Sequence, residues 1–230
     1  MEQWTIIHED GELLVADKLA PIPVQPEKSG DPSLQDLLRA GLPAPAEGKA
    51  FLEAAHRIDR RASGAVIFAK TQRALETLEA DFRARRIGKR YIVCVETEPE
   101  PASGTLENRL LWDKRTNRVR ALPKDFVATK GSTVEEARLE YRLAGRSERY
   151  FFLEIELLTG KHHQIRAQLG AAGWPIRGDV KYGARRTTRN GLIMLHARRL
   201  EFIQPRGRET LTLLAPFPES EPLWAAFTPE

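Results

Sequence analysis

The stretch between residues 91 and 158 most strongly limits what this chain can fold into. It contains successive strand-sized runs with no segment of helical spacing between them, at 91–96, 105–111, 119–122, 133–143 and 150–158. Strands that follow one another directly pair as antiparallel neighbours, whereas a doubly wound parallel sheet needs a helix after each strand. We therefore expect an α+β fold, with a mixed, mostly antiparallel sheet and flanking helices, and not a βαβ pattern.

Further strands and helices are predicted on either side of this stretch. Strands are predicted at 13–18, 192–202 and 209–214, and the continuous apolar run 65–69 predicts a strand buried on both faces. Ser33 is expected to cap a helix that extends to about Arg39, and Thr71 to open a helix that ends near Gly88. Further helices are predicted at 163–172 and after Pro222, with a loop at 42–50. No segment has the composition of a linker, so we expect a single domain over residues 1–230.

Composition limits the class of protein. No apolar run approaches the roughly 18 residues that cross a bilayer, and the first residues, MEQWTIIHED, are acidic where a signal peptide is basic. The single cysteine, Cys94, excludes an intramolecular disulfide and a cysteine-based zinc site. These features predict a protein of the reduced cytoplasm that does not enter a membrane.

The basic residues are clustered, although 36 basic residues nearly balance 32 acidic ones. The clusters are rich in arginine and lie at 83–90, 114–120, 177–189 and 198–208. Any one cluster is consistent with a solvated surface. Four clusters together favour a polyanionic partner, because the guanidinium group binds phosphate in a bidentate manner and stacks on bases.

Two stretches carry residues suited to chemistry. HRIDRRASGAVIFAK at 56–70 places Asp59 among arginines, and LLTGKHHQIRAQLGAAGWPIRGDVKYG at 157–183 places Arg166 at the start of a predicted helix. A carboxylate beside positive charge can act as nucleophile or base. The alternative is a structural ion pair at Asp59 and an ordinary surface connection at 157–183.

Other signatures of function fail. The glycine spacing from Gly173 to Gly178 resembles a phosphate loop but is followed by Asp179 and Val180 instead of Lys and Ser or Thr. His162 and His163 are adjacent, and we expect neighbouring side chains to point to different faces of a strand and not to share a metal. No metal site is therefore predicted.

Six motifs in order resemble the RluA-type family of RNA pseudouridine synthases. HRIDRRASG is similar to the His-Arg-Leu-Asp motif, LTGKHHQIRAQL to Thr-Gly-Arg-x-His-Gln-Ile-Arg, and PIRGDVKYG to Pro-Ile-x-Gly-Asp-x-x-Tyr-Gly. KRYIVCVE and LHARRLEF resemble two strands of the family, and EDGELLVADKLA resembles its N-terminal strand less closely. The resemblance extends from about residue 6 to 215. It begins almost at the first residue, so we expect no separate S4-type RNA-binding domain.

The resemblance implies an isomerase that converts uridine in tRNA or rRNA to pseudouridine without any cofactor. It places the catalytic carboxylate on Asp59, the tyrosine that stacks on the target uracil on Tyr91, and the residue that pairs with the carboxylate on Arg166. Arg57 falls on the arginine that fills the space of the flipped nucleotide. His56 is expected to be structural.

RNA contacts are expected from six residues: Arg57, Arg60, Lys161, His163, Arg185 and Arg186. Ile58 and Ala62 depart from the family pattern without touching the catalytic set, and Lys161 and His162 replace an Arg and a Thr in a way that could alter a phosphate contact. The expected partner is structured RNA, and the expected oligomeric state is a monomer.

Two alternative functions stay open. A non-catalytic RNA-binding or RNA-folding protein on the same scaffold would not need Asp59. A different cofactor-free enzyme of nucleosides or glycosides would need a second acid, and no second carboxylate lies in a comparable motif.

Overall fold

The computed structural model describes residues 3–19, 21–43, 50–113, 115–128, 133–207 and 209–227. The chain forms two compact units. Unit 1 comprises Met1–Lys89 and His196–Pro218, and unit 2 comprises Arg90–Leu195 and Glu219–Glu230. The single domain expected from the sequence stays a prediction, and each unit is described by itself. Most of the predicted loop at 42–50 lies outside the described residues.

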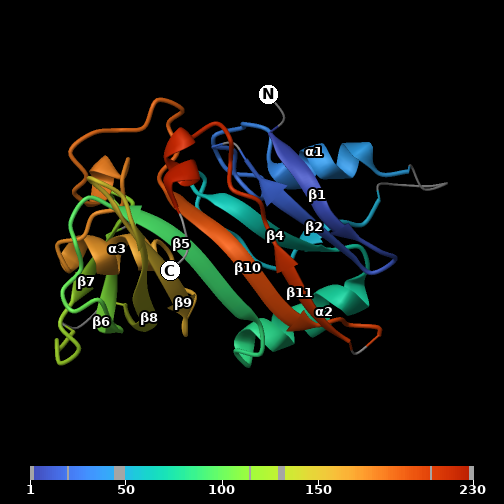
Figure 1. The fold of residues 1–230 in the computed structure, drawn as a ribbon. Coiled ribbons are helices and arrows are strands. Elements are labelled where there is room, and N and C mark those ends of the chain that lie inside the picture. Colours follow the sequence, from blue (N-terminus) through green and yellow to red (C-terminus); the bar gives the residue numbers. More distant parts are fainter. Residues whose placement is uncertain are drawn as a thin grey trace. The chain divides into compact units, whose positions relative to one another are not determined.

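The sheet of unit 1 has the strand order β1-β2-β4-β10-β11, with β3 also paired to β4 (Figure 1). Its strands are β1 (Trp4–Glu9), β2 (Leu13–Lys18), β3 (Glu53–Ala54), β4 (Ser63–Ala69), β10 (Leu195–Ile203, whose first residue belongs to unit 2) and β11 (Thr210–Leu214). The β4–β10 pair is parallel, and the other pairs of this unit are antiparallel. The strand at Trp4–Glu9 was not predicted; it carries no clean alternation, and its residues are only partly buried or exposed.

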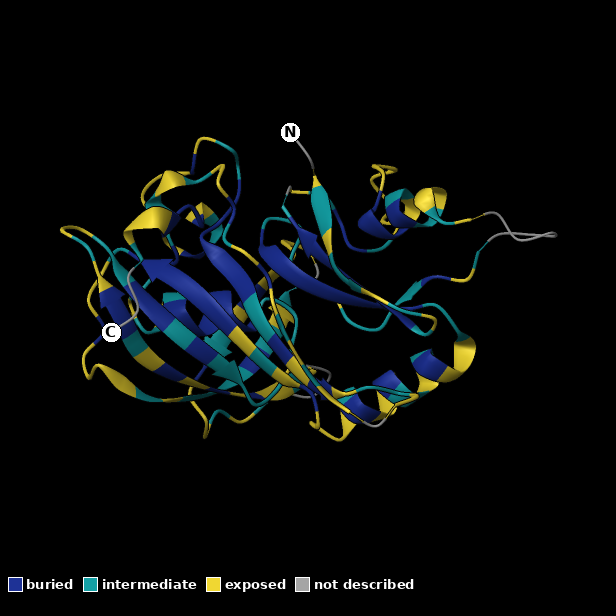
Figure 2. Ribbon diagram, turned by 45° about the vertical axis from the view of Figure 1, so that its right-hand side comes forward, coloured by how far each residue is buried: buried dark blue, intermediate teal, exposed yellow. Residues whose placement is uncertain are grey.

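Strands β2 and β4 are buried at every position, as Figure 2 shows in dark blue. The apolar run of β4 therefore lies in the interior, as its sequence predicts. One core cluster joins Leu13 and Ile67 of these strands to Leu78 of α2 (Gln72–Arg83) and Phe202 of β10. Burying an aliphatic side chain of this size stabilises a fold by about 1.5–3 kcal/mol.

Both helices of unit 1 begin where the sequence predicts. Ser33 caps α1 (Leu34–Gly41) in a capping box with Asp36, and the Thr71 hydroxyl accepts from the Ala74 N–H at the start of α2. The end of α2 was predicted wrongly near Gly88. The helix stops at Arg83 because Arg85 adopts a left-handed conformation with φ 58°, and Gly88 already belongs to β5.

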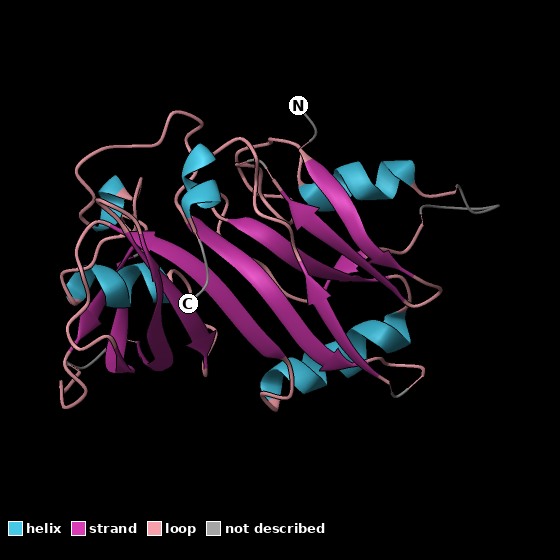
Figure 3. Cartoon of the chain, viewed as in Figure 1, coloured by secondary structure: helices cyan, strands magenta, loops and turns pink. Residues whose placement is uncertain are grey.

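The sheet of unit 2 is antiparallel, in the strand order β5-β9-β8-β6-β7 (Figure 3). Its strands are β5 (Gly88–Val95, whose first two residues belong to unit 1), β6 (Ser103–Asp113), β7 (Arg118–Leu122), β8 (Val134–Arg146) and β9 (Phe151–Leu157). These strands match the five strand-sized runs predicted between residues 91 and 158. The predicted class, an α+β fold on a mixed and mostly antiparallel sheet, is confirmed.

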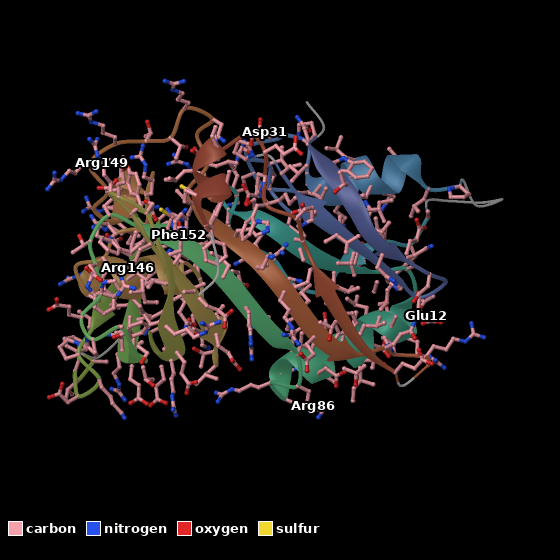
Figure 4. All side chains as sticks on the ribbon, in the orientation of Figure 1. Glu12, Asp31, Arg86, Arg146, Arg149 and Phe152 are labelled. Atoms are coloured by element: carbon pink, nitrogen blue, oxygen red, sulfur yellow. The ribbon has the colours of Figure 1, made fainter. Side chains whose placement is uncertain are left out.

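Unit 2 also contains α3 (Gln164–Ala171) and two short 3₁₀ helices, η1 (Val180–Tyr182) and η2 (Pro222–Ala226). The Phe152 ring is fully buried, 6.3 Å from the Trp224 ring and 5.2 Å from the Phe227 ring. Arg149, at the preceding turn, extends from the surface (Figure 4).

Among the described residues, no helix is long and apolar enough to span a membrane.

Candidate active site

Asp59 lies in a tight turn that leads into β4. The Ala62 N–H donates to the Asp59 carbonyl at 2.9 Å, and the Asp59 residue is partly buried. Gly64, at the start of β4, has φ +114°, and a Cβ there would lie 2.4 Å from the Ala197 carbonyl oxygen. Only glycine fits so close an approach of two strands, so the Ser-Gly end of the motif fixes where the Asp59 turn meets the sheet.

Lys18 is a functional candidate that the sequence reasoning missed. Its side chain is fully buried at the end of β2, and its Nζ donates to the Arg60 carbonyl at 2.9 Å within the Asp59 turn. Burial lowers the pKa of Lys18 to about 7, while the neighbouring charges of Asp59 and Asp17 oppose this shift. The signal was present in EDGELLVADKLA, where a lysine ends an otherwise buried strand.

His56 has a structural role, as expected. Its Nε2 accepts from the Ile67 N–H at 3.1 Å, and its ring lies 4.9 Å from the Phe82 ring. Burial of the imidazole, together with the charge of Lys89, lowers the pKa of His56 to about 3. A neutral ring that holds the backbone of β4 is not a general acid at neutral pH.

The arginines around Asp59 differ in their surroundings. Arg57 is exposed. Arg60 is engaged: its Nε donates to the Pro21 carbonyl at 3.0 Å and its Nη2 to Asp31 at 2.6 Å. The structural ion pair that the sequence left open was one at Asp59, and the Arg60–Asp31 pair does not test it. The RNA contact assigned to Arg60 stays a prediction.

Tyr91 lies on β5 in unit 2 and is only 7% exposed. It is in register with Ile155 of β9, and Ile155 with Tyr141 of β8, so the three side chains share one face of the sheet. The Tyr141 ring in turn lies 5.1 Å from the Trp174 ring. Tyr91 therefore belongs to a row of large side chains across three strands.

Arg166 is held by a buried partner that the sequence reasoning missed. Its Nε and Nη2 donate to the two carboxylate oxygens of Asp179 at 2.6 and 2.8 Å, and both side chains are almost fully buried. Such a bidentate pair fixes the plane and direction of the guanidinium group. The expected partner, Asp59, belongs to unit 1, and its pairing with Arg166 stays a prediction.

Helix α3 is held against its sheet by two glutamines. The Gln168 Nε2 donates to the Leu106 carbonyl at 3.0 Å and to Asn108 at 2.8 Å. The Gln164 Nε2 donates to the Arg138 carbonyl at 3.1 Å, and its Oε1 accepts from Thr159. These contacts explain why polar residues flank Arg166 on both sides in a helix whose residues 164–169 are all buried.

Tyr182 joins several parts of this region. Its hydroxyl accepts from the Val119 N–H at 2.9 Å and lies 2.8 Å from His163 Nδ1. The Arg166 guanidinium lies 4.9 Å from the centre of the tyrosine ring. Asp179 and Tyr182 both lie in PIRGDVKYG, so this motif carried the signal for the partners of Arg166.

The expectation that the His162 and His163 side chains point to different faces was wrong. Their rings are stacked, 3.9 Å apart with an angle of 21° between the planes, because His163 precedes α3 in a left-handed conformation (φ 52°) and is not in a strand. The geometric argument against a shared metal therefore does not hold. His162 Nε2 lies 3.2 Å from Asn117 Oδ1, and His163 Nδ1 is engaged with Tyr182.

The remaining predicted RNA contacts lie in unit 2. Lys161 donates to Glu135 at 2.8 Å. Arg185 and Arg186 lie in the loop after η1, both are exposed, and neither is within ion-pair distance of a carboxylate of the described residues. These two arginines keep their guanidinium groups available to a phosphate.

Two solved human structures share this fold. RNA pseudouridylate synthase domain-containing protein 4 matches with a TM-score of 0.75 at 22% identity, over 94% of this chain and 89% of that one. Domain-containing protein 1 matches with a TM-score of 0.77, also at 22% identity, over 99% of this chain and 89% of that one. The fold is that of a pseudouridylate synthase.

The sequence comparisons extend this from fold to family. The RNA pseudouridylate synthase family model matches residues 12–171, and the chain belongs to this family of isomerases that act on RNA. An uncharacterized RNA pseudouridine synthase of Mycobacterium bovis is 31% identical over 95% of this chain and 70% of the relative. Ribosomal large subunit pseudouridine synthase C of Vibrio vulnificus is 30% identical over 94% of this chain and 67% of the relative.

Proposed function

We propose that this protein converts a specific uridine of a structured RNA, in rRNA or tRNA, to pseudouridine, with Asp59 as the catalytic carboxylate and Tyr91 and Arg166 as its partners. The observation that carries the proposal is that the family match over residues 12–171 includes all three residues. The name of the Vibrio relative, a synthase of the large ribosomal subunit, favours rRNA.

The reaction requires these types of residue. The glycosidic C1′–N1 bond breaks, the freed uracil turns, and a C1′–C5 bond forms, after which C5 loses its proton and N1 gains one. A carboxylate close to C1′ and C6 is therefore useful. Attack of Asp59 on C1′, its addition to C6 and abstraction of the C2′ proton are three possible routes. The apolar face of Tyr91 suits the uracil ring, and its hydroxyl can relay a proton.

Arg166 contributes a positive charge that is already positioned before substrate binds. The bidentate contact with Asp179 gives its guanidinium one orientation before substrate arrives, and pre-organised charge contributes more to catalysis than charge that must reorient. Lys18, beside Asp59 in unit 1, is a second cation of this site.

The test is pseudouridine formation by Asp59→Asn with enzyme in excess over RNA. The amide keeps the size of the side chain but cannot act as nucleophile or base, so we expect product to fall below detection while RNA affinity and fold are retained. Asp125→Asn, at an exposed aspartate of unit 2, is the matched control and should retain full activity. Conversion by cleanly purified Asp59→Asn would return Asp59 to a structural role.

Arg57 is tested with two RNAs. If its side chain fills the space left by the flipped nucleotide, Arg57→Ala should lose more activity on an RNA whose target uridine is stacked than on one whose target is already unstacked. Arg73→Ala, at an exposed arginine of α2 outside the predicted RNA contacts, is the control. Equal losses for Arg57→Ala on both RNAs would assign Arg57 to a phosphate contact.

We also propose that the enzyme needs no cofactor and works as a monomer in the cytoplasm. The location is supported by the single buried cysteine, Cys94. Activity should survive dialysis against a chelator. A loss that zinc or magnesium restores would overturn the cofactor-free proposal and direct attention to the stacked His162 and His163.

A further inference from the structure

Three aromatic rings follow one another on the surface of unit 2. The Trp112 ring, at the end of β6, lies 5.2 Å from the His162 ring, which stacks on the His163 ring at 3.9 Å. Trp112 is 48% exposed, and both histidines are partly exposed. An exposed tryptophan that is held by aromatic neighbours offers a rigid flat surface to a ligand.

This row of rings, here called the aromatic platform (Trp112, His162 and His163), is fixed in place by hydrogen bonds. Asn117, in the turn after β6, adopts φ 48° and presents its Oδ1 to Trp112 Nε1 at 3.3 Å and to His162 Nε2 at 3.2 Å. His163 Nδ1 is 2.8 Å from the buried Tyr182 hydroxyl. Little entropy is therefore lost at the platform when a ligand binds.

Positive charge surrounds the platform. Arg115, in the turn between β6 and β7, and Arg118, the first residue of β7, are both exposed. Lys181 donates to the Asn117 carbonyl. The acidic group of this turn, Asp113, is occupied in holding the turn, where it accepts from the Arg115 N–H and the Thr116 hydroxyl. In Figure 1, β7 lies beside α3, which the histidines precede, so platform and hairpin belong to one surface.

We propose that an unpaired base of the RNA substrate stacks on the aromatic platform while Arg115 and Arg118 contact its phosphates. The inference rests on the proposed RNA substrate and assigns a binding role to Trp112 and His162. Stacking on an aromatic face next to arginines is how proteins bind single-stranded nucleic acid, because every base has a π-face and every nucleotide a charge. An apolar peptide carries no negative charge with which the surrounding cations could interact.

The test uses two short single-stranded probes of equal length and charge: an oligouridylate and a ribose-phosphate oligomer without bases. Wild-type protein should bind the oligouridylate more tightly, and Trp112→Ala should remove most of that preference, with a loss of about 5- to 100-fold in Kd. Trp112→Phe, which keeps a ring, should retain most of the affinity. Phe51→Ala, at an aromatic side chain that is 38% exposed in unit 1, is the control.

Salt dependence separates stacking from charge. Trp112→Ala should leave the slope of log affinity against log salt unchanged, whereas Arg115→Ala should reduce it by roughly 1. Equal affinity of the wild type for both probes, or equal effects of Trp112→Ala and Phe51→Ala, would overturn the platform. Binding is measured without turnover, so these outcomes are independent of whether Asp59→Asn abolishes pseudouridine formation.

Discussion

Each unit buries one aspartate completely, and the two aspartates are in opposite situations. Asp179 of unit 2 receives two hydrogen bonds from the Arg166 guanidinium, at 2.6 and 2.8 Å. Asp17 of unit 1 receives no hydrogen bond from the described residues at either carboxylate oxygen. Both residues have 0% exposure, so depth alone does not distinguish them.

The difference shows what burial does to a carboxylate. Burial raises the pKa of Asp17 to about 7, against the opposing charges of Lys18 and Arg198. The cost of desolvating Asp179 is offset by its bidentate contact with Arg166. The same contact fixes the direction of Arg166, which is a catalytic candidate. A partnered buried carboxylate can serve as a fixed part of a site, whereas a buried carboxylate without a hydrogen-bond partner opposes folding once it ionises.

The largest effect should follow from breaking the partnered pair. Asp179→Asn leaves the Arg166 cation almost fully buried without its counter-charge, so we expect a loss of about 3–5 kcal/mol in the free energy of unfolding, measured by urea titration. Where the variant still folds, the pseudouridine rate should also fall, because Arg166 loses its fixed direction. A loss below about 1 kcal/mol would show that water reaches the pair.

Replacing Asp17, the buried carboxylate without a hydrogen-bond partner, should increase stability where replacing Asp179 decreases it. The pKa of Asp17 is raised from its ordinary 3.8 to about 7, so its contribution to stability is fully present below pH 3.8 and is lost as the pH rises through 7. Asp17→Asn carries no such charge. Between pH 5 and pH 8 it should therefore gain about 1–3 kcal/mol relative to wild type.

The charge of Lys18 acts on Asp17, so Lys18 must be considered in this measurement. Its pKa is lowered to about 7 from 10.5, so its contribution is lost as the pH falls toward 7, opposite in sign to that of Asp17. The Asp17 charge is one of the charges that oppose the lowering of the Lys18 pKa, so the difference between wild type and Asp17→Asn reports on both residues. Glu76→Gln, at an exposed carboxylate of α2, is the control, and a pH profile for Asp17→Asn parallel to wild type would contradict the prediction.

Local signals predicted most of the fold. The Ser33 and Thr71 caps, the apolar run of β4 and the successive strands of unit 2 are all set by residues close in sequence. The end of α2 was missed because it depends on the left-handed conformation of Arg85, which its sequence does not require.

The candidate site was predicted less completely, because its partners are set by tertiary contacts. The Arg166–Asp179 pair spans 13 residues in the chain, and the contact between Lys18 and the Arg60 carbonyl spans 42. Neither spacing follows a helical or strand period. The stacking of His162 on His163 was missed because it depends on one positive φ angle at His163.

A smaller effect is expected at Tyr182, which supports the partnered pair. Tyr182→Phe keeps the ring beneath the Arg166 guanidinium but removes the hydroxyl, so the buried Val119 N–H loses its acceptor. We expect a loss of about 1–2 kcal/mol in the free energy of unfolding. The Leu variant, which removes the ring too, should cost more; equal losses would show that the hydroxyl, not the ring, carries the contribution of Tyr182.

The smallest effect on stability, and the clearest effect on RNA binding, should come from surface arginines. Like the two aspartates, these arginines differ in whether a partner of opposite charge is present. Arg185 and Arg186 have no ion-pair partner among the described residues, whereas Arg142 is paired with Glu154 at 3.1 Å. Replacing Arg185 and Arg186 by Ala should leave the urea midpoint unchanged and reduce the slope of log affinity against log salt by roughly 1–2, because two phosphate contacts are lost. Arg142→Ala should change the slope little, since its charge is already neutralised by a carboxylate. Equal slopes in the two variants would mean that ion pairing in the free protein does not decide which arginines bind RNA.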